Sequence, residues 1–122
     1  MNEEAQKDLL FQQGLDHYRS NNYFEAHESW EDLWSDYYLE DRKFVQGLIQ
    51  LSVSFVHLGR GNMNGAKSLL NKCSEKFRIY SGVHRGINVE HLLDQINNVE
   101  KMYNQLADPK DFDWTYVPKL ES

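Results

Sequence analysis

Residues 44–62 read FVQGLIQLSVSFVHLGRGN, and this stretch decides the fold class. Apolar side chains occupy most of the circumference of a helix drawn through residues 44–58, which is typical of a helix surrounded by other helices. Gly59-Arg60-Gly61 follows, and glycines of this kind commonly end a helix. The stretch therefore predicts the central helix of an all-α bundle.

Four further helices are predicted around this central one. Helical spacing of apolar residues indicates them over roughly residues 4–19, 23–36, 63–80 and 89–106. The central helix itself should begin behind Asp41. Three asparagines stand where helices should start, Asn22, Asn62 and Asn88, and Glu25 would complete a capping box with the first of them.

Domain organisation follows from length and from the position of the prolines. The chain has 122 residues, 40% of them hydrophobic, which suffices for one core. Its two prolines, Pro109 and Pro118, both fall near the end. We therefore expect a single helical domain over residues 1–108, followed by an extended tail over 109–122 that packs on the bundle through its aromatic side chains.

A weak internal repeat relates two parts of the chain at an offset of 40 residues. Six positions of the first part, Gly14, Leu15, Tyr18, Asn22, Ala26 and Trp30, align with Ser54, Phe55, Leu58, Asn62, Ala66 and Leu70. Two helical hairpins of similar design are predicted, and they look like a tetratricopeptide hairpin with a longer connection. Because only two copies occur, a compact bundle is favoured over a stacked solenoid.

Composition excludes several functions. The formal charge of −6 repels phosphate backbones and anionic lipid, so neither nucleic acid nor a membrane is an expected partner. The sequence contains no apolar signal core and no apolar run of about 20 residues, so we expect a cytoplasmic protein. Cys73 lies in an apolar helical stripe and is interpreted as a structural thiol. His17, His84 and His91 are expected at the surface.

The polar residues of the second predicted helix suggest a functional site. Within residues 23–34, YFEAHESWEDLW, the side chains of His27 and Glu31 fall inside the apolar arc of the helix. They are four residues apart and therefore neighbours, and burying both is costly unless each finds a partner. Glu28 lies at the edge of this arc.

The central helix offers partners for this pair. A narrow stripe at three- and four-residue spacing interrupts its apolar surface: Gly47, Gln50, Ser54 and His57. If the stripe faces the second helix, His27 and Glu31 converge with Gln50 and His57. Such a set can bind zinc, iron or manganese, can act as a metal-free acid–base pair, or can serve only as a hydrogen-bonded packing network. The spacing does not match the zincin protease signature, which needs a second histidine where Glu31 stands.

The ordered blocks YFEAHE, WE, FVQGLIQL and RGN, with His57 between the last two, resemble the domain of unknown function 309 family. The resemblance covers roughly residues 10–93. It implies a compact all-α fold found in small bacterial and archaeal proteins, some of which are labelled predicted metal-dependent hydrolases. On the family pattern, five residues would form a shared polar centre: His27, Glu28, Glu31, Gln50 and His57.

The leading hypothesis is a metal-dependent hydrolase. Its metal ligands would be His27, Glu31 and His57, assisted by Gln50, and Glu28 or Glu31 would accept a proton from metal-bound water. The alternative is a tetratricopeptide-like module that binds a protein partner and whose polar centre is purely structural. Exposed aromatic surface would allow a homodimer or another protein partner. The substrate is not revealed by the sequence.

Overall fold

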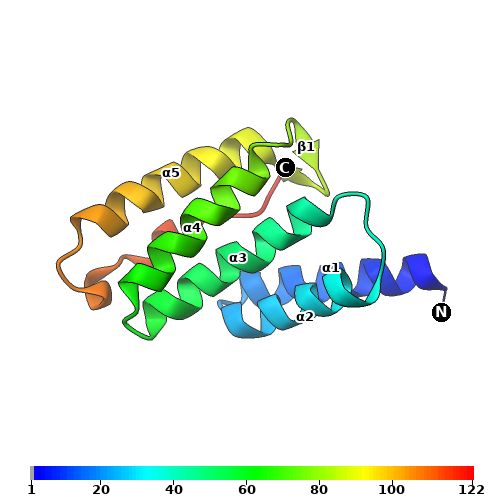
Figure 1. Ribbon diagram of the computed structural model, residues 1–122, viewed down its shortest axis with the longest axis horizontal. Helices are drawn as coiled ribbons and strands as arrows, with labels where there is room; N and C mark the ends of the chain where they lie inside the picture. The colour runs from blue at the N-terminus through cyan, green and yellow to red at the C-terminus, as the bar shows by residue number, and fades with distance from the viewer. Residues whose placement is uncertain (1) are drawn as a thin grey trace.

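Five helices make up most of the protein, and the all-α prediction is confirmed (Figure 1). The computed structural model describes residues 2–122. Beside the helices it contains a two-stranded antiparallel sheet and two short 3-10 turns. In chain order the elements are α1 (Glu3–Arg19), α2 (Tyr23–Asp36), α3 (Arg42–Gly59), α4 (Met63–Phe77), β1 (Val83–His84), β2 (Ile87–Asn88), α5 (Val89–Gln105), η1 (Pro109–Asp111) and η2 (Trp114–Tyr116).

The two predicted hairpins, α1–α2 and α3–α4, share one turn geometry. In the first turn the Asn22 N–H donates to the carbonyl of His17 at 2.8 Å, and in the second the Asn62 N–H donates to His57 at 2.8 Å. The residue before each asparagine has a positive φ, 66° at Asn21 and 79° at Gly61. The repeat at an offset of 40 residues is therefore a repeat of backbone structure.

Helix α3 is central, as its apolar circumference predicted. It packs against α2 on one side and α4 on the other, and α5 packs against α4 (Figure 1). Six of its apolar side chains are buried: Phe44, Val45, Leu48, Leu51, Phe55 and Leu58. Because they are buried from both sides, these residues lie in the hydrophobic core at the centre of the bundle.

Helices α1 and α2 come very close at Gly14. A Cβ atom on Gly14 would lie 2.1 Å from Nε1 of Trp30, so no larger residue fits there. Trp30 is fully buried, and its indole N–H donates to the carbonyl of Phe11 at 3.1 Å. This contact fixes which face of α2 points into the core.

The helix starts follow the prediction with one exception. The side chains of Asn62 and Asn88 accept hydrogen bonds from the backbone N–H groups of Gly65 and His91. Asn22 makes no such side-chain bond, so the predicted capping box with Glu25 is wrong. Asn22 instead closes the turn through its backbone, because its N–H bonds His17 and its carbonyl accepts from Ala26.

A short hairpin precedes α5 and was not predicted. Val83 pairs with Asn88 and His84 with Ile87, and the turn between them contains Arg85 and Gly86 at positive φ. Strands of two residues are too short for an alternating pattern to be visible in the sequence.

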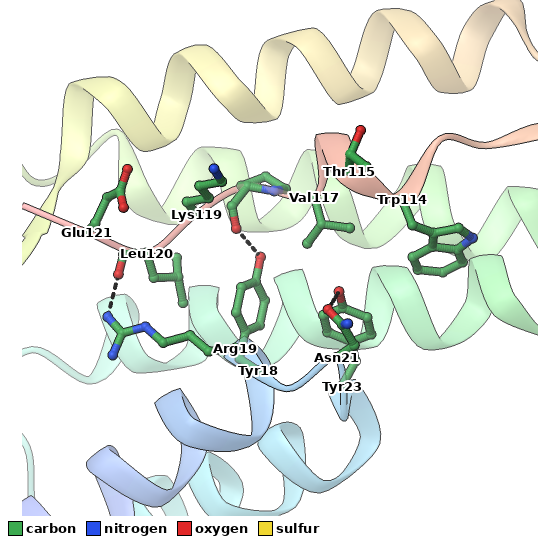
Figure 2. A pocket seen from close by; sticks show the side chains of 11 residues that line it. Tyr18, Arg19, Asn21, Tyr23, Trp114, Thr115, Val117, Lys119, Leu120 and Glu121 are labelled. Atoms are coloured by element: carbon green, nitrogen blue, oxygen red, sulfur yellow. Dashed lines mark hydrogen bonds between the residues drawn. The ribbon is translucent and has the colours of Figure 1, made fainter.

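The tail after α5 runs between α1 and α5 and is hydrogen-bonded to both (Figure 2). The hydroxyl of Tyr18 donates to the carbonyl of Pro118 and the guanidinium of Arg19 to that of Leu120, both at 2.6 Å. The side chain of Gln95 binds both the N–H and the carbonyl of Lys119. The tail therefore packs through its backbone as well as its side chains, and η1 and η2 interrupt its extended course.

Two further predictions concern burial and the membrane. Cys73 is fully buried, and burial raises the pKa of its thiol far above the usual range, as expected of a structural cysteine. Among residues 2–122, none of the helices has the length and hydropathy needed to cross a bilayer.

The contact at Gly14 yields a stability prediction. Gly14→Ala should lower the free energy of unfolding by about 1–3 kcal/mol, because the new methyl group displaces Trp30. Gly59→Ala is the matched control, because its Cβ would meet only Trp114, at 3.9 Å. Urea unfolding measures both. Equal stability of the two variants would contradict the close approach of α1 and α2.

Candidate functional site

His27 and Glu31 lie side by side on α2. His27 Nε2 is 3.2 Å from a carboxylate oxygen of Glu31. On its other side, His27 Nδ1 is 2.7 Å from the carbonyl oxygen of Phe24. The Phe24 ring also packs near the imidazole, with 5.1 Å between the ring centroids. The helix itself thus holds the imidazole in one orientation.

The pair is less buried than the sequence predicted, and the expectation of a buried His/Glu centre is wrong. The side chain of His27 is 20% exposed and that of Glu31 is 55% exposed. The reason is that the buried face of α2 is formed by Tyr23, Ala26 and Trp30. His27 and Glu31 therefore lie at the edge of that face. The pair is therefore open to solvent and to small molecules.

The hydrogen bond to Phe24 determines the protonation of the imidazole. A carbonyl oxygen only accepts, so His27 Nδ1 must carry a proton. In the neutral ring, Nε2 then has a lone pair that faces the Glu31 carboxylate at 3.2 Å. Two acceptors at this distance repel each other unless a cation lies between them, either a proton on Nε2 or a metal ion.

Gln50 lies beside Glu31 across the α2–α3 interface. Together with Trp34, Gln46 and Ile49, these two residues line a pocket of about 150 Å³. Within residues 2–122, Gln50 Oε1 and Trp34 Nε1 are buried and have no hydrogen-bond partner. An unpaired buried polar group of this kind costs about 1–3 kcal/mol.

His57 does not join this group, contrary to the expected convergence. Its ring packs on α4, because a Cβ on Gly65 would lie 2.9 Å from His57 Cγ. The Asn62 side chain donates to His57 Nδ1 at 3.3 Å while its oxygen accepts from the Gly65 N–H. His57 thus supports the start of α4, and its Nδ1 lone pair is already used.

The remaining predicted residue, Glu28, is exposed on α2. It precedes Glu31 by three positions, so the two carboxylates are neighbours on the helix surface. Over the described part of the chain, no three histidine, cysteine, aspartate or glutamate side chains are grouped closely enough to hold a metal ion. The structure thus brings together His27 with Glu31, and Glu31 with Gln50, but not all of the predicted ligands.

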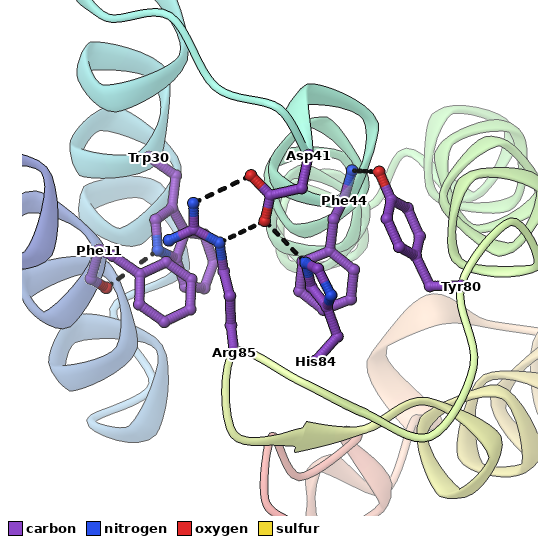
Figure 3. A network of polar contacts seen from close by, with 7 residues as sticks. All are labelled: Phe11, Trp30, Asp41, Phe44, Tyr80, His84 and Arg85. Carbon is purple, nitrogen blue, oxygen red and sulfur yellow. Dashed lines mark hydrogen bonds and ion pairs between the residues drawn. The ribbon is translucent and has the colours of Figure 1, made fainter.

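A second polar cluster, at the far end of α2, was missed by the sequence analysis. The guanidinium of Arg85 forms two hydrogen bonds to the Asp41 carboxylate, and His84 Nε2 donates to the same carboxylate at 2.7 Å (Figure 3). Arg85 also lies over the Phe11 ring, 4.7 Å from its centroid. We call Asp41, His84 and Arg85 the hairpin latch, because they tie the β1–β2 hairpin to the loop before α3.

The latch holds Asp41 in its charged form. Partial burial alone would raise the pKa of Asp41, but the hydrogen bonds from Arg85 and His84 outweigh it and lower the pKa to about 2. The positive φ of Arg85, 49°, is uncommon for a residue other than glycine and brings its side chain toward Asp41. The only signal of the latch in the sequence is the pair of glycines Gly82 and Gly86. They indicate a turn that contains His84 and Arg85, but they do not indicate the contact with Asp41.

Comparison with known proteins finds a family that resembles the part of the chain with the His27–Glu31 pair. Residues 11–69 match the family described as domain of unknown function, DUF309. This segment is just under half of the chain, and over it the chain is similar to the DUF309 family. The matched DUF309 segment includes His27, Glu31, Trp34 and Gln50, and it ends before the β1–β2 hairpin that carries His84 and Arg85.

One curated relative of the chain is the uncharacterized protein YpuF of Bacillus subtilis (strain 168). The two are 34% identical over 74 residues, which make up 60% of this chain and 41% of the relative. The chain thus covers about two fifths of the relative's length. No solved structure matches it.

The latch predicts an acid-dependent stability. A carboxyl group with a lowered pKa stabilises the fold above its unfolded pKa of 3.8, and this contribution is lost as the pH falls toward 2. Asp41→Asn should therefore cost about 2 kcal/mol at pH 7, by urea unfolding, and the difference from the wild type should shrink below pH 4. Asp94→Asn, on an exposed residue of α5, should follow the wild type. A pH-independent effect of Asp41→Asn would contradict the latch.

Proposed function

We propose that this protein binds a divalent transition-metal ion through His27 Nε2 and Glu31, and that the ion serves a hydrolytic reaction. The observation that carries the proposal is the bond from His27 Nδ1–H to the Phe24 carbonyl. It leaves the Nε2 lone pair opposite a carboxylate oxygen, an arrangement that either a proton on Nε2 or a metal ion stabilises. Nitrogen and carboxylate oxygen are suitable ligands for zinc, iron and manganese.

The exposure of the pair suits catalysis better than structural metal binding. Structural metal sites are closed by four protein ligands, whereas catalytic sites keep positions open for water and substrate. With only two ligands from the chain and Glu31 more than half exposed, such positions are open here. When bound, a metal ion lowers the pKa of a coordinated water molecule and so supplies a nucleophile for hydrolysis.

Each residue of α2 has one role in this proposal. Phe24, through its carbonyl, orients the His27 ring. Glu31 is the second ligand, so it is not free to act as the base. Glu28, exposed three residues before Glu31, is the proposed proton acceptor. His57 has no role as a ligand in this proposal: its Nδ1 accepts from Asn62, so the neutral ring carries its proton on Nε2 and has no free lone pair.

Metal analysis of variants tests this proposal. The wild-type protein, purified without an affinity tag or chelator, should bind zinc, iron or manganese near one ion per chain. His27→Ala and Glu31→Gln should each weaken binding more than about tenfold, as loss of a ligand does. His57→Ala and the exposed His91→Ala should retain the metal. Inductively coupled plasma spectrometry and titration calorimetry measure these quantities.

Two results would contradict the proposal. One is the absence of any metal after incubation with each ion. The other is equal loss of metal in His91→Ala and His27→Ala. In either case His27 and Glu31 would form an imidazolium–carboxylate pair of structural value, and a helical module that binds a protein partner would be the better hypothesis.

A further inference from the structure

A hollow with an aromatic wall lies where the start of α2 meets α3 and the tail. Its volume is about 440 Å³, and four aromatic side chains line much of it: Tyr23, Phe24, Phe55 and Trp114. Pockets for small molecules are typically about 300–1,000 Å³ in volume and mostly apolar. We call this space the aromatic hollow, and it is large enough for a small molecule.

The wall of the aromatic hollow is accessible from solvent. The side chain of Phe24 is 43% exposed and that of Trp114 is 41% exposed. Trp114 stacks near Tyr23, with 6.0 Å between the ring centroids (Figure 2), and makes an edge contact with Phe112 at 5.4 Å. These contacts hold the indole in place, so the wall is formed before a ligand arrives.

Arg60 places a positive charge beside this wall. It lies in the turn between α3 and α4, and its guanidinium carbon is 5.9 Å from the centroid of the Phe24 ring. Arg60 is exposed, and within residues 2–122 it forms no salt bridge. The charge is therefore available to a ligand that contacts Phe24.

The charges around the aromatic hollow limit what it can bind. Glu25 is exposed and also lines the hollow, so its carboxylate repels anions. Against this repulsion, Arg60 offers one positive charge. A ligand with a single carboxylate fits this balance better than a doubly charged phosphate does.

We propose that the aromatic hollow binds a small molecule that carries an apolar ring and one carboxylate. The ring packs against Phe24 and Trp114, in the offset or edge-to-face arrangements that aromatic rings prefer. The carboxylate accepts hydrogen bonds from the Arg60 guanidinium, whose planar fork matches the two carboxylate oxygens.

Phe24 connects the aromatic hollow to the candidate metal pair. Its ring centroid is 5.1 Å from that of His27, and its other neighbour is the Arg60 guanidinium. A molecule held by Arg60 against Phe24 therefore lies next to the His27 ring. That this molecule is the substrate rests on the proposed function, whereas its binding does not.

Three probes separate the ring from the charge. 3-Phenylpropionate carries both, 3-phenylpropanamide carries the ring alone, and propionate carries the charge alone. In titrations followed by the ¹H–¹⁵N signals of the tryptophan indoles, 3-phenylpropionate should shift the Trp114 signal in a saturable way, while the signal of the buried Trp30 stays unchanged. At low salt it should bind at least about threefold more tightly than the amide, because of the ion pair. It should bind at least about tenfold more tightly than propionate, because of the ring.

Variants assign the charge to Arg60. Arg60→Gln should bind the acid and the amide equally and keep the wild-type affinity for the amide. Arg78→Gln, at an exposed arginine that follows α4 and does not line the aromatic hollow, is the matched control and should keep the preference for the acid. Glu25→Gln should raise the affinity for the acid and leave that for the amide unchanged.

The outcomes separate this proposal from the metal proposal. Binding of 3-phenylpropionate that persists in His27→Ala supports the aromatic hollow even if no metal binds. The absence of a saturable shift at Trp114 overturns it, as does equal binding of the acid and the amide to the wild type. A preference for the acid that survives in Arg60→Gln, or that is lost equally in Arg78→Gln, would also overturn it.

Discussion

The indole of Trp30 occupies the space that Gly14 leaves open on α1, and the orientation of α2 depends on this contact. With Trp30 buried and bonded to the Phe11 carbonyl, Ala26 and Leu33 also point into the core. The neighbouring positions of α2 are then turned to its edge, where His27 and Glu31 meet solvent and Trp34 meets α3. A steric constraint in the first hairpin thus sets the exposure of the candidate site.

Two polar arrangements accompany this geometry, one at the loop that follows α2 and one on α2 itself. The hairpin latch holds the loop between α2 and α3 through Asp41 and so fixes how these helices enter the bundle. Nearer the middle of α2, the Phe24 carbonyl sets the protonation of His27. The latch is satisfied by partners within the chain. The His27–Glu31 pair, which is more open to solvent, is the pair to which we assign a metal ion.

The fold was largely predictable from the sequence, because helix periodicity and asparagine caps are local signals. The central helix was predicted from its periodicity and the repeated turn from the alignment of Asn22 with Asn62, although the side-chain cap expected at Asn22 does not form. The site was predictable only in part. The four-residue spacing of His27 and Glu31 shows that they are neighbours, but not that Trp30 would turn them outward. Nor could the sequence show that the Asn62 side chain would donate a hydrogen bond to His57. That contact depends on how closely α4 approaches the His57 ring at Gly65.

The hairpin latch was beyond prediction for a similar reason. Asp41 and Arg85 are 44 positions apart, and a turn with a positive φ at Arg85 brings them together. At the candidate site, His27 carries a proton on Nδ1, and we propose that it presents Nε2 to a metal ion. Long-range ¹H–¹⁵N spectra of the imidazole, recorded without and with zinc, test this directly. We predict that Nδ1 stays protonated throughout and that zinc displaces any proton from Nε2; a neutral ring protonated on Nε2 that zinc leaves unchanged would contradict the account.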